Sequence, residues 1–382
     1  MDFNLSDEQE AFRAAVVEFA GRQLNEGVAE RDAAHQFSHE AWKKCAEFGI
    51  QGLPIPVEYG GQGADPLTIV IGMEALGYGC RDNGLIFSLN AQMWSCEVPI
   101  ARFGTEAQKR RYLPGLSDGS IIGIQGMSEP GSGSDAFSLS TTARQDGDEF
   151  VLNGSKTFIT NAPVANVFVV FATADRSKGA FGISAYLIDS STPGISVGAP
   201  FHKMGLRTSP MSEITFNDCR VPASCLLGRL GAGMAIFNHS MEWERGIILA
   251  AAVGSMQRQL EASVAYARDR KQFGQPIGKF QAVSHRLADM KVRLEAARLL
   301  VYHLGWAMGE KKSTTPLESA MVKLFISESF VQSSLDTIRT HGGFGFMAEA
   351  GIERDLRDAI GGEIYSGTSD IQRNLIARHL GL

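Results

Sequence analysis

The sequence predicts a multidomain α+β protein made of three parts in chain order. Apolar residues recur at helical spacing over residues 1–120, which indicates an all-α N-terminal domain. Short β-rich runs separated by Gly, Pro and Asp fill residues 121–230 without a helix-length interruption, so we expect a middle antiparallel, barrel-like β domain. Long helical patterns return over residues 231–382 and predict a C-terminal four-helix bundle.

The N-terminal part opens with a helix start signal. Ser6 followed by Gln9 forms a capping-box pattern, and Phe12, Val16 and Phe19 continue one helical face. A Gly/Pro-rich break follows at 52–66. Further helices are expected over residues 40–48, 67–76, 84–103 and 106–113.

The middle part carries a turn signal between two β-rich runs. Residues 150–152 and 157–159 flank Asn153-Gly154, a pair typical of tight hairpin turns, so we expect a hairpin there. Further strands are expected over residues 167–172, 184–188 and 213–216.

Four helices are expected in the last part. The first runs through Ile247 and Ala251 as one long helix ending near Arg270. The others cover residues 283–301, 317–338 and 369–380.

Composition excludes several classes of function. The net charge of −6 is spread without basic runs, which argues against nucleic-acid binding. Five cysteines without a C-x-x-C pair indicate reduced thiols and no zinc site, and the histidines show no metal-ligand spacing. No apolar run reaches membrane-spanning length and no signal peptide opens the chain, so we expect a cytoplasmic protein without a membrane partner. Two G-x-G-x-x-A patterns, at 131–136 and 343–348, lack the strand–turn–helix context of a dinucleotide fold.

Four segments together resemble the acyl-CoA dehydrogenase family over essentially the whole chain, from Leu5 to Leu382. They read S-E-P-G-S-G-S-D at 128–135, N-G-S-K-T-F-I-T-N at 153–161, R-D-R-K-Q-F-G at 268–274 and I-Y-S-G-T-S-D-I-Q at 364–372. The resemblance implies that family's three-domain fold, FAD as cofactor, and oxidation of an acyl thioester.

The resemblance also implies which residues hold FAD. Those that match positions around the flavin ring are Gln125, Met127, Ser128, Ser134, Phe158 and Thr160. Those that match contacts to the pyrophosphate and adenine from a neighbouring subunit are Arg270, Phe273, Gly342 and Gly343, with Arg339 where the family usually has Gln. Thr368 and Asp370 match residues near the adenosine phosphates. Contacts across subunits imply a homo-oligomer, and the family suggests a tetramer.

The implied reaction is α,β-dehydrogenation, in which a carboxylate removes the α-proton of the thioester while a hydride leaves the β-carbon for flavin N5. Most members carry that base as Glu in I-Y-E-G-T, but this chain has Ser366 there, and serine is too weak a base. Either activity is lost or the base lies elsewhere. Glu244-Arg245 matches the pair used by a minority of members, including isovaleryl- and long-chain-type enzymes, and Arg245 would orient the base or pack below it. Glu242 and Glu363 remain rivals, and an ordinary ion-paired role for Glu244 stays open.

The resemblance implies a substrate site as well, formed by Ser134, Arg245, Tyr365, Ser366 and Gly367. Ser366 would keep its backbone N–H as a donor to the thioester carbonyl. W-E-R-G at 243–246 with Y-S-G-T at 365–368 is similar to the prolyl-carrier-protein oxidases of pyrrole-forming pathways. That branch implies an aminoacyl group on a phosphopantetheine arm, in secondary-metabolite biosynthesis.

Three alternatives stay open: a short- or branched-chain acyl-CoA dehydrogenase of catabolism, a flavin protein of this fold with other chemistry, and an inactive flavin-binding member. CoA and a carrier protein present the same pantetheine thioester, so the motifs do not separate them. The electron acceptor is expected to be an electron-transfer flavoprotein or oxygen.

Overall fold

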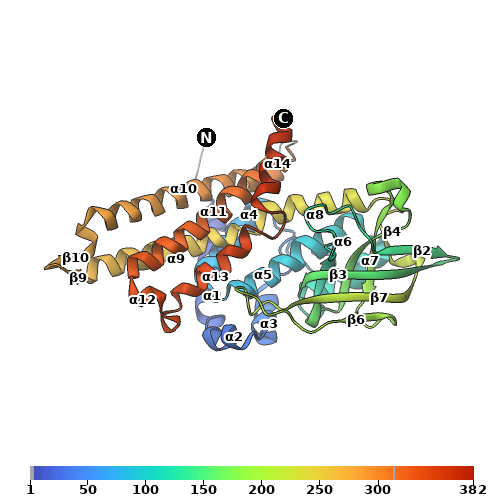
Figure 1. The fold of residues 1–382 in the computed structure, drawn as a ribbon, viewed down its shortest axis with the longest axis horizontal. Coiled ribbons are helices and arrows are strands. Elements are labelled where there is room, and N and C mark those ends of the chain that lie inside the picture. Colours follow the sequence, from blue (N-terminus) through green and yellow to red (C-terminus); the bar gives the residue numbers. More distant parts are fainter. Residues whose placement is uncertain (1–3, 313–314) are drawn as a thin grey trace.

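A computed structural model describes residues 4–312 and 315–382. The helical N-terminal part, the central sheet and the C-terminal helices follow in the predicted order, with the sheet at one end of the molecule and the long helices reaching to the other (Figure 1). The capping box at Ser6 and Gln9 is confirmed, because each side chain binds the other residue's backbone N–H. The N-terminal helices are α1 (Asp7–Gln23), α2 (Val28–Ala34), α3 (His39–Phe48), α4 (Pro66–Gly79), α5 (Asn83–Gln92), α6 (Val98–Phe103) and α7 (Glu106–Ser117).

The helix expected over residues 84–103 is not a uniform α-helix. A π-helical segment, Met93–Glu97, joins α5 to α6. Such single π-turns recur at functional sites because the extra residue per turn redirects the side chains. Here the segment carries Ser95, a side chain that reaches the cavity described below.

The middle part is one mostly antiparallel sheet in the order β6-β7-β3-β2-β4-β5-β8. The first strand, β1 (Gly123–Gly126), pairs with β4 in parallel, outside that path. The remaining strands are β2 (Thr142–Asp146), β3 (Glu149–Thr160), β4 (Val167–Thr173), β5 (Ile183–Asp189), β6 (Ile195–Val197), β7 (Met211–Pro222) and β8 (Leu226–Leu227).

The hairpin turn predicted at Asn153-Gly154 is wrong. Both residues lie inside β3, which pairs with β7 on one side and β2 on the other. Gly154 has a φ of +140°, and the register against β7 shifts between Leu152 and Gly154, which is a β-bulge. A side chain there would also collide with Thr141, since an added Cβ would lie 2.7 Å from its Cα. The chain turns instead at Gly147, between β2 and β3.

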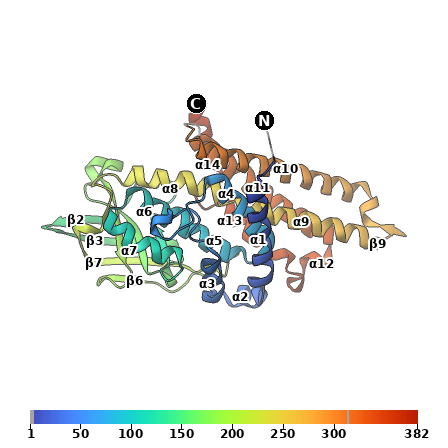
Figure 2. The same cartoon turned by 180° about the vertical axis from the view of Figure 1, so that it is seen from behind.

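The single long helix predicted to end near Arg270 is also wrong, because it is two helices. One ends at Ile247, the other begins at Ala250, and Leu249 between them has non-helical backbone angles. The break lets the first helix lie beside the sheet and the second cross α4, where Gly77 and Gly254 allow backbone-to-backbone contact (Figures 1 and 2). The C-terminal helices are α8 (Gly233–Ile247), α9 (Ala250–Asp269), α10 (Gln281–Gly309), α11 (Thr315–His341), α12 (Gly343–Phe346), α13 (Ile352–Gly362) and α14 (Ser369–His379).

Two further features matter for the site. One continuous apolar core joins the N-terminal helices to α9, α10 and α11, so these helices form a rigid frame. The chain between α9 and α10 forms a small hairpin, β9 (Lys271–Gln272) and β10 (Gln275–Pro276), at the tip farthest from the sheet (Figure 1).

Candidate active site

A cavity of about 630 Å³ lies where the three parts meet. Its walls come from α5 and the π-helical segment, from β1 and β3, from α8, and from the loop that follows α13. The walls carry both polar and apolar side chains. The lining residues include Phe87, Ala91, Ser95, Gln125, Met127, Ser128, Ser134, Phe158, Thr160, Met241, Glu244, Arg245, Ile248, Tyr365, Ser366, Gly367 and Thr368.

Glu244, in the last turn of α8, has both carboxylate oxygens held by hydroxyl groups. Ser366 Oγ donates to Oε1 at 2.5 Å, and Ser95 Oγ donates to Oε2 at 2.6 Å. Burial raises the pKa of Glu244 above the ordinary value, while the two serine hydrogen bonds and the charges of Arg245 and Lys323 oppose that rise. A carboxylate in a cavity wall with a raised pKa has the properties of a general base.

The loop that carries Ser366 is fixed from two sides. Arg245 Nε and Gln372 Nε2 each donate to the Ser366 carbonyl oxygen at 3.2 Å, and Ser366 itself has a left-handed φ of +56°. Among the residues that the structure describes, none accepts a hydrogen bond from the Ser366 N–H. This N–H is therefore available to a carbonyl oxygen in the cavity.

The two rival carboxylates do not face the cavity. Glu242 accepts a hydrogen bond from Thr315 Oγ1, and its own carbonyl oxygen accepts one from Ser319, so it is turned toward α11. Glu363 precedes the loop but is absent from the cavity wall. The geometry favours Glu244 as the base.

The six residues matched to the flavin ring all line the cavity: Gln125, Met127, Ser128, Ser134, Phe158 and Thr160. Phe158 lies at a second bulge of β3, between Lys156 and Ile159, with a left-handed φ of +58°. The bulge turns this aromatic ring out of the sheet and leaves it 65% exposed. An exposed apolar ring on a strained backbone suits the cover of a flat ring system, so these residues fit a flavin.

A buried ion pair supports that surface, and its role was not predicted from the sequence. Lys156 Nζ lies 2.7 Å from Glu129 Oε1, and both side chains are almost fully buried. Burial alone would raise the pKa of Glu129, but Lys156 and donors from Ser140 and Thr141 outweigh it and lower the pKa to about 2. The pair fixes the S-E-P-G loop onto β3. Glu129 lies in the 128–135 segment and Lys156 in the 153–161 segment, two of the four segments that resemble the family. That resemblance was the signal in the sequence that could have pointed to the pair.

The residues matched to the distal part of FAD are not brought to the cavity of the same chain. Arg270 and Phe273 lie at the tip between α9 and α10, and the Phe273 side chain is 93% exposed. The ring of Tyr266 stacks on Phe344 with centroids 6.3 Å apart, which brings the α12 segment beside the end of α9. Arg339, Gly342 and Gly343 belong to this same end of the molecule. Their role toward a neighbouring subunit remains a prediction.

Thr368 and Asp370 differ in their placement. Thr368 lines the cavity and accepts a hydrogen bond from Ile371 N as the cap of α14. The Asp370 side chain is 90% exposed and pairs with Arg373 at 3.5 Å. Thr368 is therefore the better placed of the two for contact with a ligand in this cavity.

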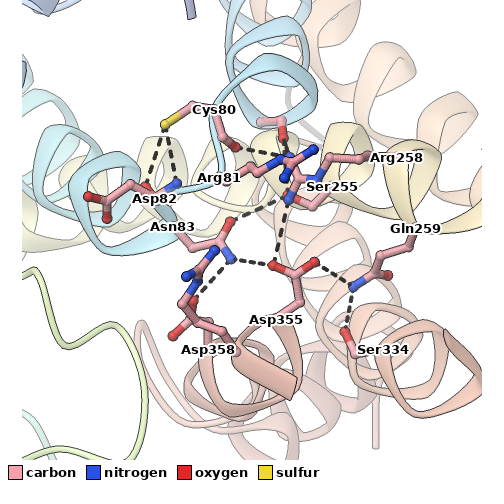
Figure 3. Close-up of polar contacts among 12 residues, drawn as sticks. Cys80, Arg81, Asp82, Asn83, Ser255, Arg258, Gln259, Ser334, Asp355 and Asp358 are labelled. Atoms are coloured by element: carbon pink, nitrogen blue, oxygen red, sulfur yellow. Dashed lines mark hydrogen bonds and ion pairs between the residues drawn. The ribbon is translucent and has the colours of Figure 1, made fainter. Parts of the chain in front are cut away.

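A polar network holds two walls of the cavity together (Figure 3). Asn83 Nδ2, at the start of α5, donates to Asp355 Oδ1 at 3.0 Å and to Asp358 Oδ2 at 3.1 Å, both on α13. Arg258 of α9 adds an ion pair to Asp355 at 3.6 Å. Because α5 carries Phe87 and α13 leads into Tyr365, the network sets the approach of these two rings, whose centroids are 4.6 Å apart.

The described part of the chain shows no other class of site among metal, disulfide and membrane-spanning features. No group of three or more His, Cys, Asp or Glu residues there is placed to hold a metal ion. The five cysteines are all free. No described helix is long and apolar enough to cross a membrane.

The cavity, its carboxylate and the three-part fold define an acyl-thioester dehydrogenase that uses FAD, and the chain belongs to the acyl-CoA dehydrogenase family. The models of that family's N-terminal, middle and C-terminal domains match residues 6–120, 125–219 and 231–381. The chain is an enzyme of this class, and it catalyses FAD-dependent α,β-dehydrogenation of an acyl thioester.

Three particular relatives are similar over the full length. An L-prolyl-[peptidyl-carrier protein] dehydrogenase from Pseudomonas fluorescens is 44% identical, with 100% of each chain covered. The crystal structure of the prolyl acyl carrier protein oxidase AnaB has 49% identity and a TM-score of 0.98, covering 99% of this chain and 100% of the other. The structure of PigA with FAD and proline has 43% identity and a TM-score of 0.98, with 100% of each chain covered.

Proposed function

We propose that this enzyme dehydrogenates a prolyl group held as a thioester on a carrier protein, with Glu244 as the base. The observation that carries the proposal is the position of Glu244, in the cavity wall between Ser95 and Ser366. The prolyl substrate is suggested by the relatives, which are named for prolyl groups on carrier proteins.

The chemistry of one turnover assigns a task to each group. Glu244 takes the proton from the α-carbon, and the electron pair of that C–H bond becomes one bond of the new α,β double bond. The N–H of Ser366 stabilises the charge that develops on the thioester oxygen. Bound FAD supplies the acceptor for the hydride that leaves the β-carbon.

The residues proposed to hold FAD fall into two sets. Thr368 would lie near the phosphates. The flavin ring would contact the six cavity residues Gln125, Met127, Ser128, Ser134, Phe158 and Thr160. The set at the other end, Arg270, Phe273, Arg339, Gly342 and Gly343, would serve the FAD of a second subunit. Arginine suits this role because it offers paired donors to phosphate. This arrangement requires at least a homodimer, and a tetramer is our proposal.

Anaerobic flavin bleaching tests the function. Purified protein is mixed with prolyl-carrier protein or with butyryl-CoA, and the loss of flavin absorbance is followed. We expect bleaching by prolyl-carrier protein that Glu244→Gln abolishes while FAD stays bound, with Glu242→Gln as the matched control that retains it. Bleaching by butyryl-CoA alone would contradict the prolyl substrate, and full activity of Glu244→Gln would contradict the base.

A further inference from the structure

Ser95 and Ser366 come from distant parts of the chain to the same carboxylate. Ser95 is the third residue of the π-helical segment. Ser366 lies in the loop after α13 and has a left-handed backbone conformation. Each hydroxyl donates its hydrogen bond to a carboxylate oxygen of Glu244. Each hydroxyl oxygen still has lone pairs that can accept a hydrogen bond. The wall around the base thus offers hydrogen-bond acceptors from three side chains.

Part of the wall near the base is apolar. Phe87, Ala91, Met241 and Ile248 supply hydrocarbon surface. Arg245 donates to the Ser366 carbonyl oxygen.

Tyr365 contributes its aromatic ring to this wall. Its hydroxyl oxygen lies 3.6 Å from the position that a Cβ on Gly362 would occupy, so it is turned back toward α13. Its ring packs against Phe87. The two serine hydroxyls and the carboxylate itself are thus acceptors grouped at the base.

Bond lengths limit how far an α-substituent can lie from the base. The oxygen of a base that abstracts an α-proton must lie about 3 Å from the α-carbon. A nitrogen on the α-carbon lies about 1.5 Å from that carbon. The hydroxyl oxygens lie 2.5 and 2.6 Å from the carboxylate oxygens that meet the α-proton, so an α-nitrogen on the side of either serine can reach hydrogen-bond range of its hydroxyl oxygen. An amine N–H matches them, and a plain methylene leaves them unpaired.

We propose that Ser95 and Ser366 recognise the nitrogen on the α-carbon, so that the site selects α-aminoacyl thioesters over plain acyl thioesters of the same shape. The inference rests on the proposed function for its reaction and adds the residues that set the substrate class. Ser366, which stands where most of the family has its base, is then a specificity-determining residue.

Two substrates that differ in one atom test this. Prolyl-carrier protein is compared with cyclopentanecarbonyl-carrier protein, which keeps the five-membered ring and both reacting C–H bonds but replaces N–H by CH₂. We expect wild-type kcat/KM to favour the prolyl group by about tenfold or more, the value of one well-placed hydrogen bond to a charged group. Ser95→Ala, Ser366→Ala and the double variant should reduce that ratio stepwise toward one.

Ser117→Ala is the matched control, since it removes a buried hydroxyl that donates to the Gly60 carbonyl oxygen outside the cavity. It should leave the ratio unchanged. A wild-type ratio near one overturns the proposal without any variant. Serine variants that slow both thioesters equally also overturn it, because they would show that the hydroxyls only position the base. Failure of the proposed function looks different, since wild type would then oxidise neither carrier-bound thioester and would oxidise an acyl-CoA instead.

Discussion

Ser366, at the position where most of the family has its catalytic glutamate, donates a 2.5 Å hydrogen bond to Glu244, 122 residues earlier in the chain. The two positions that can carry the base in this family therefore meet across one cavity. With serine at 366, Glu244 is the carboxylate where these two positions meet, and the Ser366 hydrogen bond stabilises its ionised form.

The pH dependence of turnover should report this contact. Burial holds the pKa of Glu244 above the usual value, so activity should rise with pH through an acid limb that lies above the titration of an ordinary glutamate. The bonds from Ser95 and Ser366 lower that pKa, so Ser366→Ala and Ser95→Ala should each move the limb to higher pH. Profiles of kcat/KM check this, and a limb that moves to lower pH, or moves equally in Ser117→Ala, would contradict it.

Removal of Lys156 should destabilise the protein strongly. Lys156→Met leaves the Glu129 carboxylate buried without its cation, which costs about 3–5 kcal/mol. Urea unfolding measures the loss, and Glu129→Gln combined with Lys156→Met should cost less than Lys156→Met alone. Lys178→Met, which breaks an exposed pair with Asp175, is the control and should cost under about 1 kcal/mol. Equal effects of the two lysine variants would count against the buried pair.

Removal of Lys323, in contrast to removal of Lys156, should stabilise the protein. Its side chain is fully buried on α11, and Nζ has no hydrogen-bond partner within residues 4–312 and 315–382. Burial lowers its pKa to about 8 from 10.5, so the unfolded chain holds the proton more tightly and stability should rise with pH between these values. Lys323→Met should therefore raise the free energy of unfolding at pH 7 by about 1–3 kcal/mol.

The same variant should also affect the base. The charge of Lys323 lowers the pKa of Glu244, so its removal should move the acid limb of kcat/KM upward. Urea unfolding at pH 7 and the activity profile are two independent measurements. A less stable Lys323→Met protein with an unchanged limb would show that the ammonium is solvated or paired in solution.

The network at Asn83 should affect activity as well as stability. Asn83→Ala leaves Asp355 and Asp358 without their shared donor, at a cost of about 1–3 kcal/mol. Because the network joins α5 to α13, we also expect kcat/KM to fall severalfold. Gln108→Ala removes three partly buried hydrogen bonds outside the cavity, two to backbone carbonyl oxygens and one from Thr105 N, and should lose stability without that loss of activity. If both variants lose activity in proportion to stability, the network has no positioning role.

Local patterns in the sequence determined the class of fold and the family. Helical periodicity, the capping box at Ser6 and the short β-rich runs depend on neighbours a few residues apart, so they can be read along the chain. The Glu244-Arg245 pair was found the same way, by its match to a motif.

Local signals failed where distant partners decide the backbone. The Asn153-Gly154 pair signals a positive φ, and a hairpin turn or a β-bulge satisfies that signal equally. Pairing of β3 with β7, more than sixty residues later in the chain at Gly154 and Phe216, selected the bulge. The break between Ile247 and Ala250 likewise follows from the different partners of α8 and α9, while the apolar spacing continues across it.

The sequence by itself thus determined the reaction class, the three-part order and a candidate base for this protein. Only the tertiary structure decided what surrounds that base. Ser95 lies 149 residues from Glu244 and belongs to no motif, so nothing in the chain marks it. The physical reason is that a hydrogen bond depends on where two atoms lie in space, and long-range packing of α8 against the π-helical segment places them there.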